Sequence, residues 1–134
     1  ADVTPEQTRM CHELLGAVGE VAWIEDEALM DAVTGVSGSG PAYVFLLTEC
    51  LADVGVEAGL PRDLADQLAR TTVQGAGALM ATSDVPAAKL RENVTSPGGT
   101  TEAALAELIG EPALRDLMRK AVAAAVRRSQ ELSG

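Results

Sequence analysis

Aromatic residues are almost absent from this sequence of 134 residues, since Trp23, Tyr43 and Phe45 make up only 2% of it. A core without rings has to be built from Ala, Leu, Val and Met, which pack well where two backbones approach closely, and this favours helix on helix. A domain of this size buries about two-thirds of the surface of its unfolded chain. The length excludes a complete Rossmann dehydrogenase or TIM barrel within these residues.

Histidine and cysteine are also rare. His12 is the single histidine, which excludes a zinc site of mixed Cys and His ligands and a relay of two histidines. Cys11 and Cys50 have no metal-ligand spacing and lie in apolar, helical stretches. We predict that both are buried small hydrophobes rather than a disulfide or a nucleophile, and that the chain has no metal site.

The sequence has neither a signal peptide nor an apolar run of 18 residues, which predicts a cytoplasmic protein outside the membrane. The net charge of −10 is concentrated in residues 1–60, where eleven acids face Arg9 alone. A negative field of this kind argues against DNA or RNA as a partner. The sequence begins without Met in the middle of a helical pattern, from which we expect a fragment of a longer protein.

Helical periodicity dominates the chain. Thr4 as N-cap and Pro5 at the first helical position predict a helix that reaches Val18. Further helices are predicted over residues 25–33, 39–58, 62–80, 84–93, 102–109 and 111–132. Residues 42–47 are apolar on all sides, so we expect the helix over 39–58 to be the central, buried one.

A single strand is predicted, over Glu20–Ile24, where apolar and polar residues alternate. A lone strand is unstable because its backbone groups need a partner. The first helix and this strand are therefore expected to be the end of a larger sheet or to pair with another chain. The small residues at 75–78 predict a close helix–helix approach, because glycine inside a helix costs roughly 1 kcal/mol against alanine.

The first of two glycine-rich stretches covers residues 35–41, Gly-Val-Ser-Gly-Ser-Gly-Pro. It does not match the dinucleotide fingerprint, and it follows a helix instead of a strand. We predict a flexible turn that ends one helix, with Ser39 capping the next helix and Pro41 opening it. Small residues here would also let a backbone or a ligand come near.

The second stretch, Ser96-Pro97-Gly98-Gly99-Thr100-Thr101, precedes a predicted helix that Thr100 or Thr101 would cap. Free N–H groups, two glycines that permit close approach and two hydroxyls together form a site for an anion of carboxylate or phosphate size. An ordinary capped turn is the competing interpretation.

Four segments of the sequence resemble the pyrroline-5-carboxylate reductase family, and together they cover nearly the whole chain. They are residues 31–45, 52–62, 93–101 and 128–132. The resemblance implies an all-α dimerisation domain of the 6-phosphogluconate dehydrogenase C-terminal-like type, a helical bundle that forms a homodimer, preceded by a helix–strand remnant of a Rossmann domain. Residues 1–25 would be that remnant, and residues 26–134 the dimerisation and substrate-binding domain.

The resemblance also implies an activity: NADPH- or NADH-dependent reduction of 1-pyrroline-5-carboxylate to L-proline, in proline biosynthesis. The missing N-terminal domain would bind most of the cofactor, so we expect this chain alone to be inactive. The family's substrate-binding positions correspond to Ser96, Gly98, Gly99, Thr100 and Thr101. Thr101 matches the threonine placed at the ring nitrogen, so it is the catalytic candidate, with positioning as its main role.

Asn93 and Val94 match positions near the cofactor. The resemblance further implies a homodimer through the helices over 39–58 and 62–80, which larger oligomers could extend. Two other hypotheses stay open at this stage. One is a stand-alone helical dimerisation module without catalysis, and the other is a different imine or ketone reductase of the same architecture.

Overall fold

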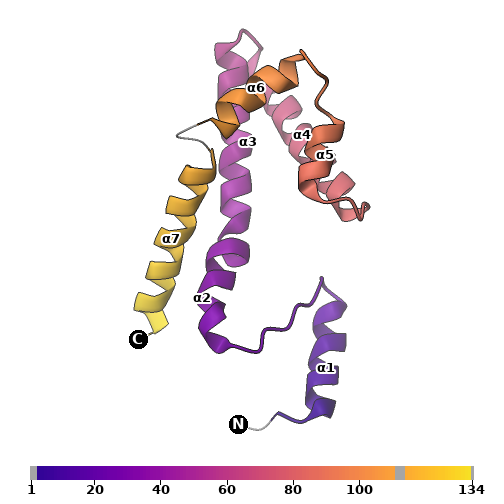
Figure 1. The fold of residues 1–134 in the computed structure, drawn as a ribbon, viewed down its shortest axis with the longest axis vertical. Coiled ribbons are helices and arrows are strands. Elements are labelled where there is room, and N and C mark those ends of the chain that lie inside the picture. Colours follow the sequence, from indigo (N-terminus) through magenta and orange to yellow (C-terminus); the bar gives the residue numbers. More distant parts are fainter. Residues whose placement is uncertain (1–2, 111–113, 134) are drawn as a thin grey trace. The chain divides into compact units, whose positions relative to one another are not determined.

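The computed structural model describes residues 3–110 and 114–133. The chain divides into two compact units, with the boundary in the sequence between Met30 and Asp31. The first unit begins with helix α1, Pro5–Gly16 (Figure 1). Thr4 caps α1 as predicted: its hydroxyl accepts from the Gln7 amide at 3.3 Å, and the Gln7 side chain accepts from the Thr4 amide at 2.8 Å. This reciprocal capping box satisfies two amides that the helix itself cannot bond.

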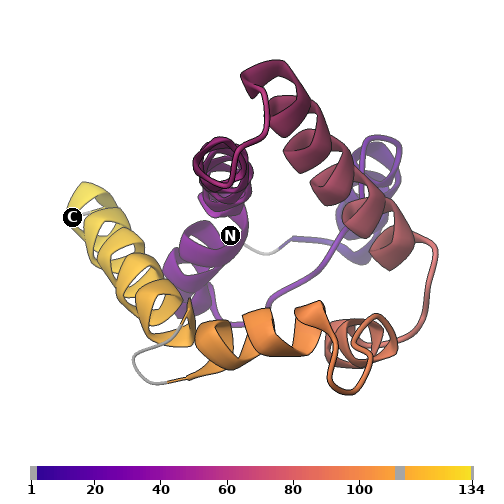
Figure 2. The ribbon, with the colours of Figure 1, turned by 90° about the horizontal axis from the view of Figure 1, so that it is seen from above.

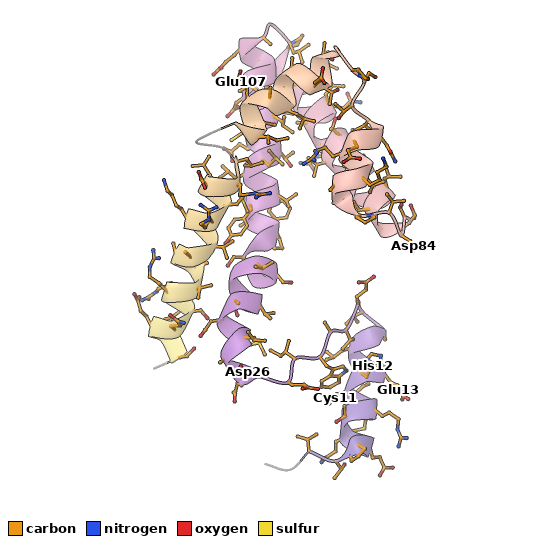
Figure 3. All side chains as sticks on the ribbon, in the orientation of Figure 1. Cys11, His12, Glu13, Asp26, Asp84 and Glu107 are labelled. Atoms are coloured by element: carbon orange, nitrogen blue, oxygen red, sulfur yellow. The ribbon has the colours of Figure 1, made fainter. Side chains whose placement is uncertain are left out.

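The predicted strand over Glu20–Ile24 is wrong, because these residues form no regular element. The described part of the chain offers no second strand, so the backbone has no ladder to join. Trp23 instead folds back on α1, where its Nε1 donates to His12 Nδ1 at 3.2 Å and the two rings stack. A 3₁₀ turn, η1 (Glu27–Leu29), follows, with Asp26 as its N-cap. Figure 3 shows His12 on α1 and Asp26 before η1.

Among the described residues of the second unit, every regular element is a helix. Its elements in chain order are α2 (Met30–Val33), the π-helix η2 (Thr34–Gly38), α3 (Gly40–Glu57), α4 (Arg62–Ala81), α5 (Ala87–Asn93), α6 (Thr100–Ile109) and α7 (Leu114–Ser133). The end of α3 at Glu57 and the span of α4 agree with the sequence within one residue. The start predicted for the last helix, at 111, lies outside the described residues. Figure 2 shows α7 beside η2 and the start of α3, with α4 on the other side of α3.

The turn predicted over 35–41 is also wrong, because residues 34–38 form the π-helix η2, and only Ser39, the N-cap position of α3, separates η2 from α3. The Ser39 amide donates to the Thr34 carbonyl at 2.9 Å, a bond that spans five residues and defines the π-helix. Ser39 itself makes no side-chain capping bond. Tyr43 of α3 donates its hydroxyl to the Gly35 carbonyl at 3.0 Å, which ties η2 to the helix that follows it.

The surroundings of Gly35 in η2 explain why this position is a glycine. It is buried under α7, and a Cβ added to it would lie 3.0 Å from Val126 Cγ2 and 3.4 Å from the Val122 carbonyl oxygen. Ser129 of α7 donates to Asp31 at 2.6 Å along the same contact. Glycine is therefore used here to let two helical backbones approach, and not to break a helix.

Helices α3 and α4 pack through small side chains. A Cβ added to Gly55 would touch Ala65 at 3.4 Å, and Ala52, Ala65 and Ala69 are the buried apolar residues of the described chain. Gly59, at φ +102°, makes the turn between the two helices. At the mouth of this turn Arg62 contacts Asp53 at 2.8 Å and Asp66 at 3.3 Å. The hydrogen bond to Asp53, followed by that to Asp66, raises the pKa of the Arg62 guanidinium.

The prediction of a buried α3 is wrong for this chain by itself. Phe45, Leu46 and Leu47 are 71%, 58% and 48% exposed, and both cysteines, predicted to be buried, are exposed. The apolar side chains of α3 are therefore left uncovered by the described helices of their own unit.

Helix α4 does not make the close helix–helix approach that was predicted at 75–78. A Cβ added to Gly75 or Gly77 would meet no atom within 4 Å, so no other described part of the chain lies close to these glycines. Among the described residues, no helix is both long and apolar enough to cross a membrane.

Candidate functional site

The candidate site is the loop of residues 94–99, which connects α5 to α6, together with the first turn of α6. The Gly99 amide donates to the Ser96 carbonyl at 3.0 Å, and Gly98 adopts a left-handed φ of +70°. The N-cap of α6 is Gly99, and the first helical bond runs from the Ala103 amide to the Gly99 carbonyl at 3.2 Å. The prediction that Thr100 or Thr101 caps this helix is therefore wrong, since both lie inside it.

The first turn of α6 leaves amide groups free. Within residues 3–110 and 114–133, no acceptor bonds the N–H groups of Thr100, Thr101 or Glu102. The side chains of both threonines are exposed beside them. Free amides and the positive end of the helix dipole favour an anion at this point.

Glu102 is a residue of this site that the sequence analysis missed. Its carboxylate accepts a hydrogen bond from the Gly98 amide, with Gly98 N and Glu102 Oε2 2.7 Å apart. Glu102 stands three residues after the N-cap Gly99, the spacing at which Glu reaches back in a capping box. That spacing was the signal in the sequence that could have identified Glu102. In this structure its side chain bonds Gly98, the residue before the N-cap, instead of the N-cap itself.

The predicted substrate-binding residues thus fall into two groups. The amides of Gly98 and Gly99 already donate within the chain, to Glu102 and to Ser96. The amides and hydroxyls of Thr100 and Thr101 remain available to a ligand. The loop therefore presents its two threonines and holds its two glycines in place.

Asn93 and Val94 lie just before this loop. Asn93 is the last residue of α5, and Val94 is its C-cap and is 63% exposed. The exposed side chains of this pair offer one amide and one apolar contact at the edge of the loop. A groove of about 510 Å³ between α5 and α6, lined in part by Thr95, Glu102 and Leu105, adjoins the loop.

Comparison with known proteins identifies a family that fits this loop. The family model described as pyrroline-5-carboxylate reductase dimerisation matches residues 27–132. The chain is similar to the pyrroline-5-carboxylate reductases of Pisum sativum (48% identical), Synechocystis (50%) and Pseudomonas aeruginosa (45%), over 97%, 97% and 99% of this chain. It covers 47%, 48% and 48% of those proteins, so it spans about half the length of the curated relatives it matches.

Solved structures agree with these relatives. The pyrroline-5-carboxylate reductase of Coxiella burnetii superposes with a TM-score of 0.90 at 39% identity, over 97% of this chain and 48% of that one. The pyrroline carboxylate reductase of Plasmodium falciparum, solved with NADP bound, gives 0.82 at 33% identity, over 99% of this chain and 53% of that one.

Proposed function

The chain belongs to the pyrroline-5-carboxylate reductase family, and on that premise we propose that it is the dimerisation and substrate-binding part of an enzyme that reduces 1-pyrroline-5-carboxylate to L-proline in proline biosynthesis. The observation that carries the proposal is the pair of free amides on Thr100 and Thr101, beside two threonine hydroxyls. The substrate has the matching chemistry, since it carries a carboxylate next to a ring nitrogen.

The amides at the start of α6 would bind the substrate carboxylate. An ionised carboxylate accepts N–H bonds more strongly than a neutral oxygen does, and the helix dipole favours its charge. Ser96, Gly98 and Gly99 would shape the loop around it. Thr101, which carries one of these free amides, would also place its hydroxyl at the ring nitrogen.

Reduction adds a hydride to the carbon of the C=N bond and a proton to its nitrogen, and the product is the secondary amine. When bound, NADPH or NADH supplies the hydride. A threonine hydroxyl is a poor acid, so Thr101 would orient the ring nitrogen and relay a proton through water rather than generate one.

The residues of this chain would contact only one edge of the cofactor and would not hold its phosphates. Asn93 and Val94 offer an exposed amide and an exposed apolar side chain. The described residues hold no strand followed by a glycine fingerprint, the element that cradles a dinucleotide phosphate. A preceding domain would hold the rest of the cofactor, and this chain alone would be inactive. The boundary between the two predicted domains, 1–25 and 26–134, and the cytoplasmic location of the protein remain predictions from the sequence.

A homodimer through α3 and α4 would cover the exposed apolar surface. The two helices form a groove of about 530 Å³ that Val44, Phe45 and Val73 help to line. The open space over Gly75 and Gly77 lies on the same helix, α4, and suits a partner helix at close distance.

Substitution of Thr101 in the full-length protein tests the catalytic proposal. Thr101→Val keeps the shape and removes the hydroxyl, and we expect kcat for pyrroline-5-carboxylate to fall by about 10- to 100-fold. Thr101→Ser keeps the hydroxyl and should retain most of the activity. Equal kcat in Thr101→Val and wild type would remove Thr101 from the site. A wild-type protein that reduces another imine but not pyrroline-5-carboxylate would refute the substrate, and one without any reductase activity would favour a plain dimerisation module.

Sedimentation tests the dimer. At micromolar concentration the chain should sediment at about twice 13.8 kDa, because exposed apolar surface of this extent drives association. Phe45→Asp, on the exposed face of α3, should shift it toward the monomer, while Glu107→Ala on α6 should not. A folded wild-type monomer would contradict the proposal.

A further inference from the structure

We propose that Glu102 is a positioning residue for the substrate carboxylate: by holding the Gly98 amide, it fixes the loop so that the free amides of Thr100 and Thr101 face the ligand. This inference rests on the proposed function, and it assigns to Glu102 a role that the resemblance does not supply. The bond of 2.7 Å from Gly98 N to Glu102 Oε2 is its first observation.

The second observation is that Pro97 and Gly98 would otherwise be weakly held, whereas Thr95 at the start of the loop is bonded to α5. Gly98 lies at a left-handed φ of +70°, and a Cβ added to it would meet no atom within 4 Å, so packing does not fix this residue. Glycine is the residue with the most conformational freedom to lose. Besides the Glu102 bond, the described residues provide one other hydrogen bond across the turn, from Gly99 N to Ser96 O. Removal of Glu102 therefore leaves residues 97–98 free to sample other conformations.

The third observation is which amides the bond leaves free. The Glu102 carboxylate is bound to the Gly98 amide, one residue before the N-cap Gly99, whereas the unbonded amides are those of Thr100, Thr101 and Glu102 itself, on the far side of Gly99. The Glu102 carboxylate accordingly acts from outside the group of amides that would bind the substrate. It orders the approach to that group, and its role is that of a hydrogen-bond acceptor rather than a charge at the ligand.

A split between KM and kcat distinguishes this role from catalysis. A loop held less firmly binds the substrate and the transition state less well by the same amount, which raises KM and leaves kcat unchanged. Thr101, in contrast, is expected to affect kcat because it would contact the reacting nitrogen. The two neighbouring residues should therefore give opposite kinetic signatures.

The experiment uses three variants of the full-length enzyme. Glu102→Ala should raise KM for pyrroline-5-carboxylate by about three- to tenfold, the range of one hydrogen bond, with kcat within about twofold of wild type. Glu102→Gln keeps an acceptor at the same reach and should restore KM. Glu107→Ala, which removes an exposed glutamate of the same helix (Figure 3), is the matched control and should behave as wild type.

Amide hydrogen exchange gives a readout that needs no activity. The Gly98 amide should exchange slowly in wild type and in Glu102→Gln, and faster in Glu102→Ala, while the Thr100 and Thr101 amides exchange fast in all three without ligand. An unchanged or lowered KM in Glu102→Ala, or a Glu102→Gln variant as impaired as Glu102→Ala, would overturn the proposal. These outcomes leave the proposed function standing, because it fails only if the wild-type enzyme does not reduce pyrroline-5-carboxylate.

Discussion

The two glycine-rich segments of this chain, 35–40 and 96–101, have similar compositions and opposite structures. The first is helical except at Ser39, and Gly35 in it is buried against Val122 and Val126 of α7. The second is a turn in which Gly98 has a positive φ and α6 begins with unbonded amides. Glycine serves close packing in one segment and backbone freedom in the other, and composition does not distinguish the two uses.

This contrast predicts that substitutions in the first segment change stability alone, whereas substitutions in the second also change substrate binding. Three experiments in the full-length enzyme can break or sharpen the comparison. Stability is compared at equal protomer concentration, because the stability of a dimer depends on it.

Gly35→Val should have the largest effect. Its Cβ would lie 3.0 Å from Val126 Cγ2 and 3.4 Å from a backbone oxygen of α7, so either α7 or η2 must move. We expect a loss of about 2–3 kcal/mol in the free energy of unfolding, the usual cost of overpacking, measured by urea denaturation, with KM unchanged. Gly40→Ala is the control, because a Cβ there meets no atom within 4 Å. An equal loss in both variants would show that close packing is not the reason for glycine at position 35.

Gly98→Ala should have an intermediate effect on stability and a clear effect on binding. A Cβ at φ +70° costs about 1 kcal/mol, which thermal unfolding can measure. The strain also disturbs the turn that orders Thr100 and Thr101, so KM for pyrroline-5-carboxylate should rise. Gly98→Asn should be milder in both respects, because Asn tolerates the left-handed conformation better than Ala. A Gly98→Ala variant with wild-type KM would remove this loop from substrate binding.

Tyr43→Phe should have the smallest effect. It removes the hydroxyl that donates to the Gly35 carbonyl at 3.0 Å and keeps the ring. Because this hydrogen bond is only partly buried, we expect a loss of about 0.5 kcal/mol in the free energy of unfolding and no change in KM, checked by urea denaturation and steady-state kinetics. A raised KM would show that the segment 35–40 also contributes to the ligand site, which would end the contrast between the two segments.

Much of the helical structure was predictable from the sequence because its signals are local. Thr4 and Pro5 mark the start of α1, and the apolar spacing over 62–80 marks α4 within one residue. The loop at 96–101 was also identified before the structure, since glycines and hydroxyls ahead of a helix indicate free amides. Local sequence thus located the starts of α1 and α4 and the exposed amides, but it began α5 at 84 instead of Ala87 and placed the N-cap of α6 on a threonine instead of Gly99.

Several of the errors share one physical cause, which is dependence on a distant group, whereas the misplaced N-cap of α6 is a local error. Glu20–Ile24 has a strand pattern but no partner strand in the described chain, and Trp23 stacks on His12 instead. The segment 35–40 was interpreted as a turn because the approach of α7, about 90 residues later in the chain, is not visible in its own residues. Phe45 and Cys50 are exposed although their helical pattern is apolar, because such a pattern does not show which atoms would cover the helix.

By itself the sequence determined the helical class, the capped start of α1 and the family, because these depend on residues within a few positions of one another. Only the tertiary structure decided that Gly35 packs under α7 and that Glu102 holds the Gly98 amide while Thr100 and Thr101 stay free. The physical reason is that a hydrogen-bond donor has no fixed partner until the fold brings an acceptor within reach. In the same way, whether a glycine serves close packing or a turn depends on the neighbours that the fold places beside it.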